Sequence, residues 1–318
     1  MTGMSNFVIS AFYRFTPLRE SGLERLRRRA LAAMRECGAR GSILLAPEGI
    51  NGSIAGERGG VDAVLAKLGE EPGLENLTAT TAETFAAEIP FKRAKVKIKK
   101  EIVTLGVPGL DARDAGERVA PEEWNALLDD EEILLVDARN TYEIAIGGFS
   151  GALNPQTENF REFPEFAAQK LDARSHSGVG GAGGVAMYCT GGIRCEKASA
   201  YLKTRGFARV FQLHGGVLNY LARVRGGDSR WRGECFVFDE RVSVDRDLQR
   251  GAYQQCHACR RPLSRADLQS PHYTAGASCP HCHADTTADA RARFAERQKQ
   301  TELAARRGRA HLGPMAME

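Results

Sequence analysis

Long hydrophobic runs are missing from this 318-residue sequence. None of its apolar stretches approaches the roughly 20 residues that a helix needs to cross a bilayer, so we expect no membrane span. The opening stretch, MTGMSNFVISAFYRF, lacks the basic segment and long apolar core of a secretory signal. These absences predict a cytoplasmic location. In that reducing compartment the eight cysteines are more often metal ligands or nucleophiles than disulfides.

The sequence also contains no flavin, nicotinamide or non-haem iron motif. Charge is present but unevenly placed. The net charge is +4, while the segment from Arg246 to the end holds 12 Lys and Arg against 7 Asp and Glu. A basic end indicates an anionic partner without identifying it.

The first segment, residues 1–105, has the pattern of an α+β domain. Strands are expected at NFVISAFYRF, GSILLA, 75–81 and 93–104, with helices over 17–37 and 61–68. That order predicts a βαββαβ ferredoxin-like unit. The stretch 106–120, rich in Gly, Pro and charge, is predicted to be a linker.

The second segment, residues 121–227, alternates helices with apolar strands and therefore predicts a parallel α/β sheet. A Gly- and Ser-rich insert at 175–184 is predicted to be a flexible loop. A Cys-rich module follows at 228–285, and then a basic helical or disordered tail at 286–318. The expected helices are 121–129, 161–171, 195–205 and 216–224, and the expected strands are EILLVDA, VAMYC and RVFQL.

A cysteine ends one of these strands, in the stretch MYCTGGIRCEKASAYL. Ligands of parallel α/β sheets bind at the carboxyl ends of strands, beside helix N-termini. The glycines let backbone N–H groups turn inward, and these dipoles with Arg194 should lower the pKa of the Cys189 thiol. We therefore predict a thiolate nucleophile at Cys189 rather than a buried structural cysteine. The predicted active-site loop is Thr190, Gly191, Gly192, Ile193, Arg194 and Cys195.

Two further cysteines are less certain in role. Cys195 is either a packed small residue or a resolving thiol for Cys189. Cys235, in the apolar run CFVFD, is predicted to pack in a core.

Four cationic residues alternate along FKRAKVKIKKE: Arg93, Lys95, Lys97 and Lys99. In a strand they share one face, while the apolar residues between them share the other. A solvated charged face usually mixes both signs, yet no acidic residue interleaves here. The pattern predicts a cationic surface that binds phosphates without reading bases.

Four trailing cysteines form two C-x2-C pairs, Cys256 with Cys259 and Cys279 with Cys282. This spacing is typical of a zinc ribbon, in which two knuckles give four thiolates to a tetrahedral ion. We predict a closed structural zinc site. Free cysteines or a disordered segment are the alternative.

The C-x4-R loop between a strand and a helix resembles the active-site loop of rhodanese domains. LLVDARNTYE, GFSGALN and VFQLHGGVLNY resemble further rhodanese segments, although Gly148 stands where many rhodaneses have His. The loop is one residue shorter than the C-x5-R loop of protein phosphatases. That length favours a bare sulfur or a planar group over a tetrahedral phosphate.

Longer motifs narrow the resemblance: LAPEGINGSIAG, FREFPEF, MYCTGGIRCEKASAYL and WRGECFVFDERVSV. From about Asn6 to His283 the chain resembles one bacterial family, the oxygen-dependent tRNA uridine(34) hydroxylases. These are rhodanese-containing proteins with an acylphosphatase-like N-terminal domain. The resemblance implies C5 hydroxylation of uridine 34 in the tRNA anticodon loop, with Cys189 as catalytic residue. It implies dioxygen as co-substrate, with an electron donor that no motif identifies.

Three functions stay open at this point. In the hydroxylase, Cys189 either adds to C6 of uracil, with Arg194 and the loop amides stabilising charge, or carries a persulfide. A rhodanese-type sulfurtransferase would use the same cysteine without needing the cationic strand. A non-catalytic RNA-binding adaptor would not need Cys189 at all.

Overall fold

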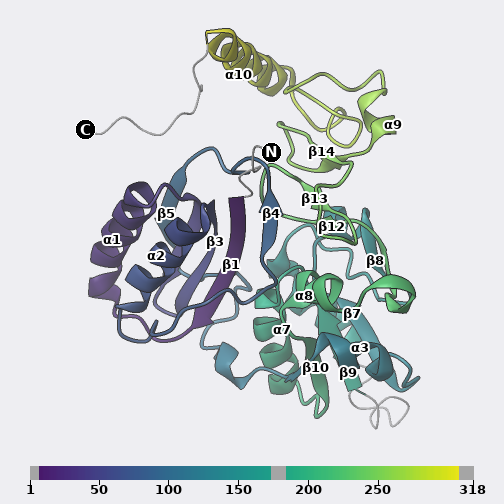
Figure 1. The fold of residues 1–318 in the computed structure, drawn as a ribbon. Coiled ribbons are helices and arrows are strands. Elements are labelled where there is room, and N and C mark those ends of the chain that lie inside the picture. Colours follow the sequence, from purple (N-terminus) through teal and green to yellow (C-terminus); the bar gives the residue numbers. More distant parts are fainter. Residues whose placement is uncertain (1–6, 173–183, 308–318) are drawn as a thin grey trace.

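The computed structural model describes residues 7–172 and 184–307. Two α/β domains lie beside each other, and a small Cys-rich module with a long helix lies against them (Figure 1). The predicted flexible loop at 175–184 falls, except for Gly184, outside the described residues. The same holds for the last part of the basic tail, 308–318.

The N-terminal domain is a five-stranded sheet of order β4-β1-β3-β2-β5, covered on one face by two packed helices (Figure 1). Strand β1 pairs antiparallel with β3 and β4, and β2 pairs antiparallel with β3 and parallel with β5. The predicted βαββαβ order is thereby confirmed, with β5 added at the edge. The elements are β1 (Phe7–Phe15), α1 (Leu23–Glu36), β2 (Arg40–Ala46), β3 (Gly49–Gly56), α2 (Arg58–Gly69), β4 (Thr84–Ala86) and β5 (Ala94–Ile98).

The helical face predicted for the first helix is confirmed. Leu23, Leu26, Ala30 and Met34 are all buried in the core of this domain. Helix α1 ends at Glu36, before Gly38, whose φ of 68° lies in the left-handed region that suits glycine.

The prediction of a strand at 75–81 was wrong. Leu74 and Leu77 are both buried, three positions apart, and Asn76 between them has a φ of 55°. That spacing and backbone conformation do not fit an extended strand. The final strand of the unit is instead β4, and the strand expected at 93–104 is limited to β5.

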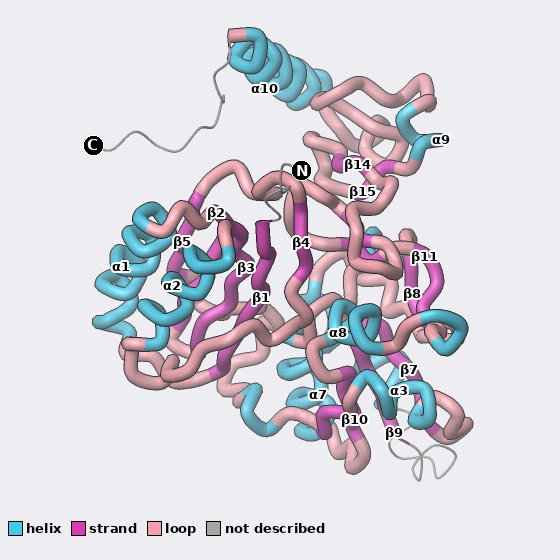
Figure 2. The backbone as a smooth tube through the Cα atoms, viewed as in Figure 1, coloured by secondary structure: helices cyan, strands magenta, loops and turns pink. Residues whose placement is uncertain are grey.

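The second domain contains a parallel sheet, as predicted, and its strand order is β6-β10-β9-β7. Figure 2 shows its strands β7, β9 and β10. The helix expected at 161–171 is divided into a 3-10 turn (Phe160–Glu162), α5 and a π-helical turn (Ala167–Leu171). The other elements are β6 (Glu117–Val119), α3 (Pro121–Leu127), β7 (Ile133–Asp137), α4 (Thr141–Ile144), β8 (Gly147–Phe149), α5 (Phe163–Phe166), β9 (Gly184–Tyr188), α7 (Ile193–Thr204), β10 (Val210–Leu213) and α8 (Gly216–Arg223).

Alternate residues of β9 build two cores, one on each face of this sheet. Ala186 and Tyr188 pack with residues of α3 and α8, whereas Val185 and Met187 pack with α5 and α7. Cys189 follows on the α7 side. The strand therefore delivers its last residue to the start of α7, at the edge where ligands of such sheets bind.

The segment after α8 continues the second domain before it forms the Cys-rich module. Strand β11 pairs with β8, and residues from Trp231 to Leu248 share a core with α3 and α8. The predicted boundary at 227/228 thus lies between segments with a common core. The remaining elements are β11 (Trp231–Gly233), β12 (Cys235–Phe236), β13 (Ser243–Val244), β14 (Gln254–Gln255), β15 (Pro262–Leu263), α9 (Arg265–Leu268) and α10 (Ala288–Arg306).

Helix α10 accounts for part of the predicted basic tail, and none of its residues is buried. Across 7–172 and 184–307, no helix combines the length and the apolar character that crossing a bilayer requires.

Candidate active site and metal site

The cysteine predicted as nucleophile lies directly after β9, with 1% of its surface exposed. The backbone N–H of Gly192 donates to Cys189 Sγ at 3.1 Å. On the other side, α8 holds the loop. The N–H of Val217 donates to the Cys189 carbonyl at 3.0 Å, and that of Leu218 to the Thr190 carbonyl at 3.2 Å. The predicted loop is therefore a fixed turn clamped between two helix N-termini.

Two glycines make this turn sterically feasible. Gly192 has a φ of 94°, which aims its N–H at the sulfur. Gly216 has a φ of 66°, and a Cβ there would lie 2.4 Å from the Cys189 carbonyl oxygen. The glycine pair in LHGGV therefore permits close packing of α8 on the cysteine loop.

The electrostatics of the loop favour a thiolate at Cys189. Burial opposes ionisation, but the Cys195 thiol, the charge of Arg194 and the backbone N–H groups of both residues outweigh it. Together they lower the pKa of Cys189 to about 6. Burial and the neighbouring Cys189 raise the pKa of Cys195 well above its ordinary value. At neutral pH the pair is thus a Cys189 thiolate beside a neutral Cys195 thiol.

Cys235 shows how burial changes the pKa of a thiol that lacks the hydrogen-bond donors found at Cys189. It lies in the second domain's core, as predicted, and burial raises its pKa to about 12. The hydrogen bonds at Cys189, and not burial, distinguish the two cysteines.

Arg194 is itself held by a carboxylate that the sequence analysis did not single out. Its Nη1 and Nη2 lie 2.6 and 2.7 Å from Glu143 Oε2 and Oε1, and both side chains are buried. Glu143 also accepts from Thr190 Oγ1 at 3.2 Å. It closes a capping box with Asn140 at the start of α4, so the NTYE segment was the available signal.

The N-terminal domain covers the cysteine loop. A Cβ on Gly191 would lie 3.1 Å from Thr81, and one on Gly192 would lie 3.0 Å from Tyr13 Oη. Tyr13 donates to Glu196 at 2.9 Å, and burial with this carboxylate raises the Tyr13 pKa well above its ordinary value. Contacts between residues this far apart in the chain leave no local sequence pattern.

A second polar contact joins the domains at α7. Lys197 is buried, and its Nζ lies 2.7 Å from Glu48 and 2.6 Å from Glu101. Glu48 belongs to the motif LAPEGINGSIAG and Lys197 to MYCTGGIRCEKASAYL. Two motifs that are distant in sequence therefore meet in one ion-pair cluster.

The predicted cationic residues flank or belong to the edge strand β5. Val96 points into the core, while Arg93, Lys97 and Lys99 are exposed and Lys95 is half-buried. Partial burial and the neighbouring cations Lys97, Arg93 and Lys99 lower the Lys95 pKa. Within the described ranges, no carboxylate forms an ion pair with any of the four. We call these four residues the β5 cation stripe.

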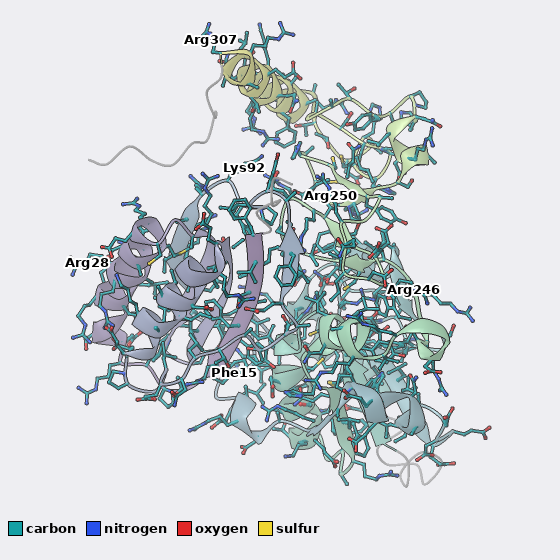
Figure 3. All side chains as sticks on the ribbon, viewed as in Figure 1. Phe15, Arg28, Lys92, Arg246, Arg250 and Arg307 are labelled. Carbon is teal, nitrogen blue, oxygen red and sulfur yellow. The ribbon has the colours of Figure 1, made fainter. Side chains whose placement is uncertain are left out.

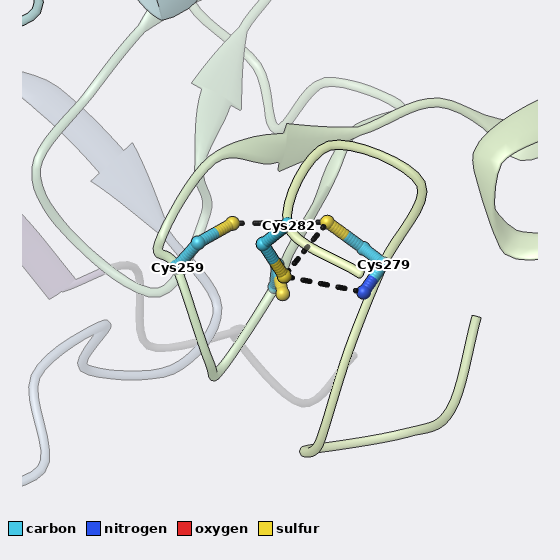
Figure 4. A group of neighbouring side chains, drawn as sticks. Cys259, Cys279 and Cys282 are labelled. Atoms are coloured by element: carbon cyan, nitrogen blue, oxygen red, sulfur yellow. Dashed lines mark hydrogen bonds between the residues drawn. The ribbon is translucent and has the colours of Figure 1, made fainter. Parts of the chain in front are cut away.

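The four trailing cysteines come together in the C-terminal module. Figure 4 shows three of them, Cys259, Cys279 and Cys282. All four sulfur atoms lie within 4.8 Å of one another. The Sγ–Sγ distances are 3.7 Å for Cys259–Cys279 and 3.6 Å for Cys279–Cys282. Tetrahedral zinc with Zn–S bonds of about 2.3 Å requires about 3.8 Å between sulfurs. The donor set therefore fits a closed four-thiolate zinc site.

Two segments of the chain match known domain families. Residues 7–102 match the family described as UPF0176 acylphosphatase like domain, and residues 120–223 match the Rhodanese-like domain. The molecule is thus a rhodanese-like protein with an acylphosphatase-like N-terminal domain. The chain has the domain architecture of the UPF0176 proteins, and it fits the family that its sequence resembles.

Several solved structures are similar to parts of the chain. A rhodanese-related protein from Thermoplasma volcanium is 14% identical, with 35% of this chain and 95% of that one covered and a TM-score of 0.28. The rhodanese-like domain of an Anabaena protein is 19% identical, covering 36% and 78%, with a TM-score of 0.27. An acylphosphatase from Coxiella burnetii is 14% identical, covering 30% and 100%, with a TM-score of 0.21.

Proposed function

We propose that this protein hydroxylates uridine 34 of tRNA at C5 with dioxygen, and that Cys189 is its nucleophile. The observation that carries the proposal is the setting of the Cys189 sulfur: the Gly192 N–H donates to it at 3.1 Å and Arg194 lies on the same loop, and this setting favours a thiolate at neutral pH. The unpaired β5 cation stripe supports a polyanionic substrate. The sequence resemblance supplies the particular nucleoside, and we propose that the reaction takes place in the cytoplasm.

The thiolate would make C5 of uracil reactive. Its addition forms a C–S bond at C6 and moves an electron pair onto C5 and O4 as an enolate. One oxygen atom of O2 then becomes the C5 hydroxyl, and the other becomes water, which takes two electrons and two protons from an external reductant. Loss of the C5 proton expels the thiolate and restores the ring. The loop N–H groups and the charge of Arg194 stabilise the thiolate as leaving group.

Access to the sulfur requires movement of the covering residues. Cys189 is almost completely buried, and Tyr13 and Thr81 of the N-terminal domain lie against its loop. The base must also leave the anticodon stack to reach the sulfur. We therefore propose that tRNA binding moves the N-terminal domain away from the loop.

A sulfurtransferase is the second candidate, favoured by the same thiolate in a rhodanese-like loop. In this case the Cys189 thiolate would attack the outer sulfur of thiosulfate, so that the S–S bond of thiosulfate breaks, sulfite leaves and a persulfide forms on Cys189. It would then pass that sulfur to an acceptor. A thiosulfate:cyanide assay tests this directly, and it does not involve the β5 cation stripe.

We also propose that the four clustered cysteines hold a structural zinc ion. When bound, zinc would link the two knuckles and order the module. The closed four-thiolate set leaves no open position for substrate, so we assign the ion no step in the reaction.

Nucleoside mass spectrometry tests the hydroxylase. A strain lacking the protein would be complemented with wild type or with Cys189→Ser, each grown with and without oxygen, so that the cell supplies the reductant. We expect 5-hydroxyuridine in tRNA only with wild type and only in air. Identical nucleosides in all strains would refute the hydroxylase. Full activity of Cys189→Ser would instead favour an RNA-binding adaptor.

A further inference from the structure

Phe238 is the most exposed large hydrophobic side chain among the described residues, with 63% of its surface exposed. It follows β12, at the start of the tight turn that leads to β13. The turn is closed by hydrogen bonds between Val237 and Val242 and between Val242 and Asp239. A single exposed apolar ring is ordinary on a protein surface, so the case for binding depends on what surrounds Phe238.

The support beneath this ring is fixed. Arg241 pairs with Asp239 at 2.7 Å with both side chains buried, and its Nη1 donates to Thr84 of β4 at 2.8 Å. The N–H of Glu240 donates to the Pro90 carbonyl at 3.0 Å. The turn is thus anchored to the N-terminal domain at two points. A side chain on such a support loses little conformational entropy when it binds a partner.

A cavity of about 390 Å³ lies beside the ring, where the two domains and the Cys-rich module meet. This volume falls within the range of small-ligand pockets, about 300–1000 Å³. Aromatic rings of Tyr142, Phe236 and Phe238 line it together with the cations Arg93, Lys95 and Arg260. The cavity therefore combines flat apolar surfaces with positive charge.

The carboxylates at this cavity are already paired. Asp239 is held by Arg241, and Glu240 lies 3.5 Å from Lys92. Figure 3 shows Lys92 at the top of the N-terminal domain, facing the module. Arg260 has a φ of 70°, a backbone conformation that few residues except glycine adopt without cost. An arginine at this knuckle position brings a further cation to the cavity.

The same ring adjoins the cysteine loop. The guanidinium carbon of Arg194 lies 5.9 Å from the centre of the Phe238 ring, and Phe236 packs edge-to-face on that ring at 5.2 Å. The Phe236 carbonyl accepts a hydrogen bond from Thr190 Oγ1 at 3.4 Å. The cavity therefore lies on the Thr190–Arg194 side of the proposed reaction centre.

We infer that Phe238 is a stacking platform for a nucleobase of single-stranded RNA, and that Arg93, Lys95 and Arg260 hold the phosphates of that strand. Every base has a flat π-face, and a ring beside a cationic groove is the combination that binds single strands. The choice of RNA rests on the proposed function, but the stacking does not require hydroxylation to occur.

The test is the affinity of the full-length protein for a fluorescent anticodon stem-loop RNA with uridine at position 34. We expect Phe238→Ala to bind about 5- to 150-fold more weakly, the range that follows from removing one stacked aromatic ring. Phe238→Trp should restore binding because indole also stacks. Phe85→Ala is the matched control, since Phe85 is 49% exposed but lines a different cavity.

A second readout separates stacking from folding. Trp124 and Trp231, the two native tryptophans, are buried. In Phe238→Trp, added RNA should therefore quench a fluorescence signal that wild type lacks. Unchanged affinity in Phe238→Ala, an equal loss in Phe85→Ala, or no quenching in Phe238→Trp would each overturn the inference. An exclusively protein-binding surface would give the first of these results.

The result of this RNA-binding test does not depend on the result of the hydroxylation test. Weakened RNA binding by Phe238→Ala, without 5-hydroxyuridine in any strain, would leave the stacking site and refute the hydroxylase. Normal binding by Phe238→Ala, with 5-hydroxyuridine present in the wild-type strain, would refute the stacking site and leave the hydroxylase.

Discussion

Arg194 reaches Glu143 through two hydrogen bonds of 2.6 and 2.7 Å, and the carboxylate that accepts them is fully buried. This bidentate pair fixes the guanidinium beside the cysteine loop. Arg194 therefore acts on Cys189 through its charge, from a position that α4 determines. The sequence motif contains the arginine, but the carboxylate that positions it lies 51 residues earlier.

The first prediction concerns the stability of this pair. Glu143→Gln leaves the Arg194 charge buried without its partner, a change that typically costs about 3–5 kcal/mol. We expect the free energy of unfolding to fall by that order at neutral pH. Trp124 and Trp231 report this transition, because both lie in the core of the second domain.

The control and the pH dependence make this prediction specific. Glu122→Gln breaks an exposed pair with Arg223 and should cost less than about 1 kcal/mol. Burial opposes ionisation of Glu143, but Arg194 outweighs it and lowers the Glu143 pKa. The stabilisation that the ionised Glu143 gives the folded state is therefore present above the pKa of this carboxyl in the unfolded state. It is lost as pH falls through the pKa of the same carboxyl in the folded state. The difference between wild type and Glu143→Gln should shrink in acid, and a constant difference would contradict this account.

The second prediction concerns the Cys189 thiolate. A step in thiolate absorbance with a midpoint near pH 6 should be present in wild type and missing in Cys189→Ser. Cys195→Ala removes a hydrogen-bond donor and should raise the Cys189 pKa. Cys195→Ser keeps a donor and should leave it low. Cys235, with its pKa raised to about 12, does not interfere in this range.

The lowered thiol pKa also predicts how stability depends on pH. Because the pKa of the Cys189 thiol is lower in the folded state, its ionisation stabilises the fold. This contribution is fully present above the pKa of the thiol in the unfolded state, about 8.5. That contribution is lost as pH falls through about 6. The free energy of unfolding should therefore rise between these pH values in wild type and rise less in Cys189→Ser. Parallel pH profiles would show that Cys189 is protonated at neutral pH.

Local patterns in the sequence predicted most of the sites' own residues. Cys189 and its glycines are adjacent in the chain, and each C-x2-C pair is local, so their spacing carries the signal. Tyr13, Thr81 and Glu143 reach the cysteine loop only through the packing of distant segments. The burial of Cys189 beneath the N-terminal domain depends on that packing, and no window of the sequence contains it.

The strand prediction failed for segment 75–81, whose structure is determined by packing and not by a periodic sequence pattern. Leu77 of this segment and Leu74, three positions before it, instead fill the helix-covered core from an irregular backbone. By contrast, β5 was found because its alternating cations have a period of two, which survives even at a sheet edge.

The third prediction concerns the β5 cation stripe. The double variant Lys97→Gln/Lys99→Gln should weaken binding of the anticodon stem-loop RNA. It should also reduce the slope of log affinity against log salt by about one for each phosphate that the protein no longer neutralises. The matched control is Arg28→Gln/Arg35→Gln, which removes two exposed charges from α1 of the same domain. Equal losses of affinity would mean that net charge, and not the stripe, governs binding.

The fourth prediction concerns the metal. We expect one zinc ion per chain by elemental analysis in wild type and in Cys37→Ser, because Cys37 lies in the N-terminal domain. Zinc should be lost in Cys279→Ser. The module has few buried residues apart from its cysteines, so the metal supplies much of its order.

Removal of zinc should therefore act locally. Amide hydrogen exchange should accelerate in residues 254–283 of Cys279→Ser and of chelator-treated wild type. It should stay unchanged in β9 and α7, which have cores of their own. Because Arg260 extends from the same knuckle into the Phe238 cavity, RNA affinity should also fall when the module loses its metal. Full protection of 254–283 without zinc would show that the four cysteines pack as a small core, without a metal.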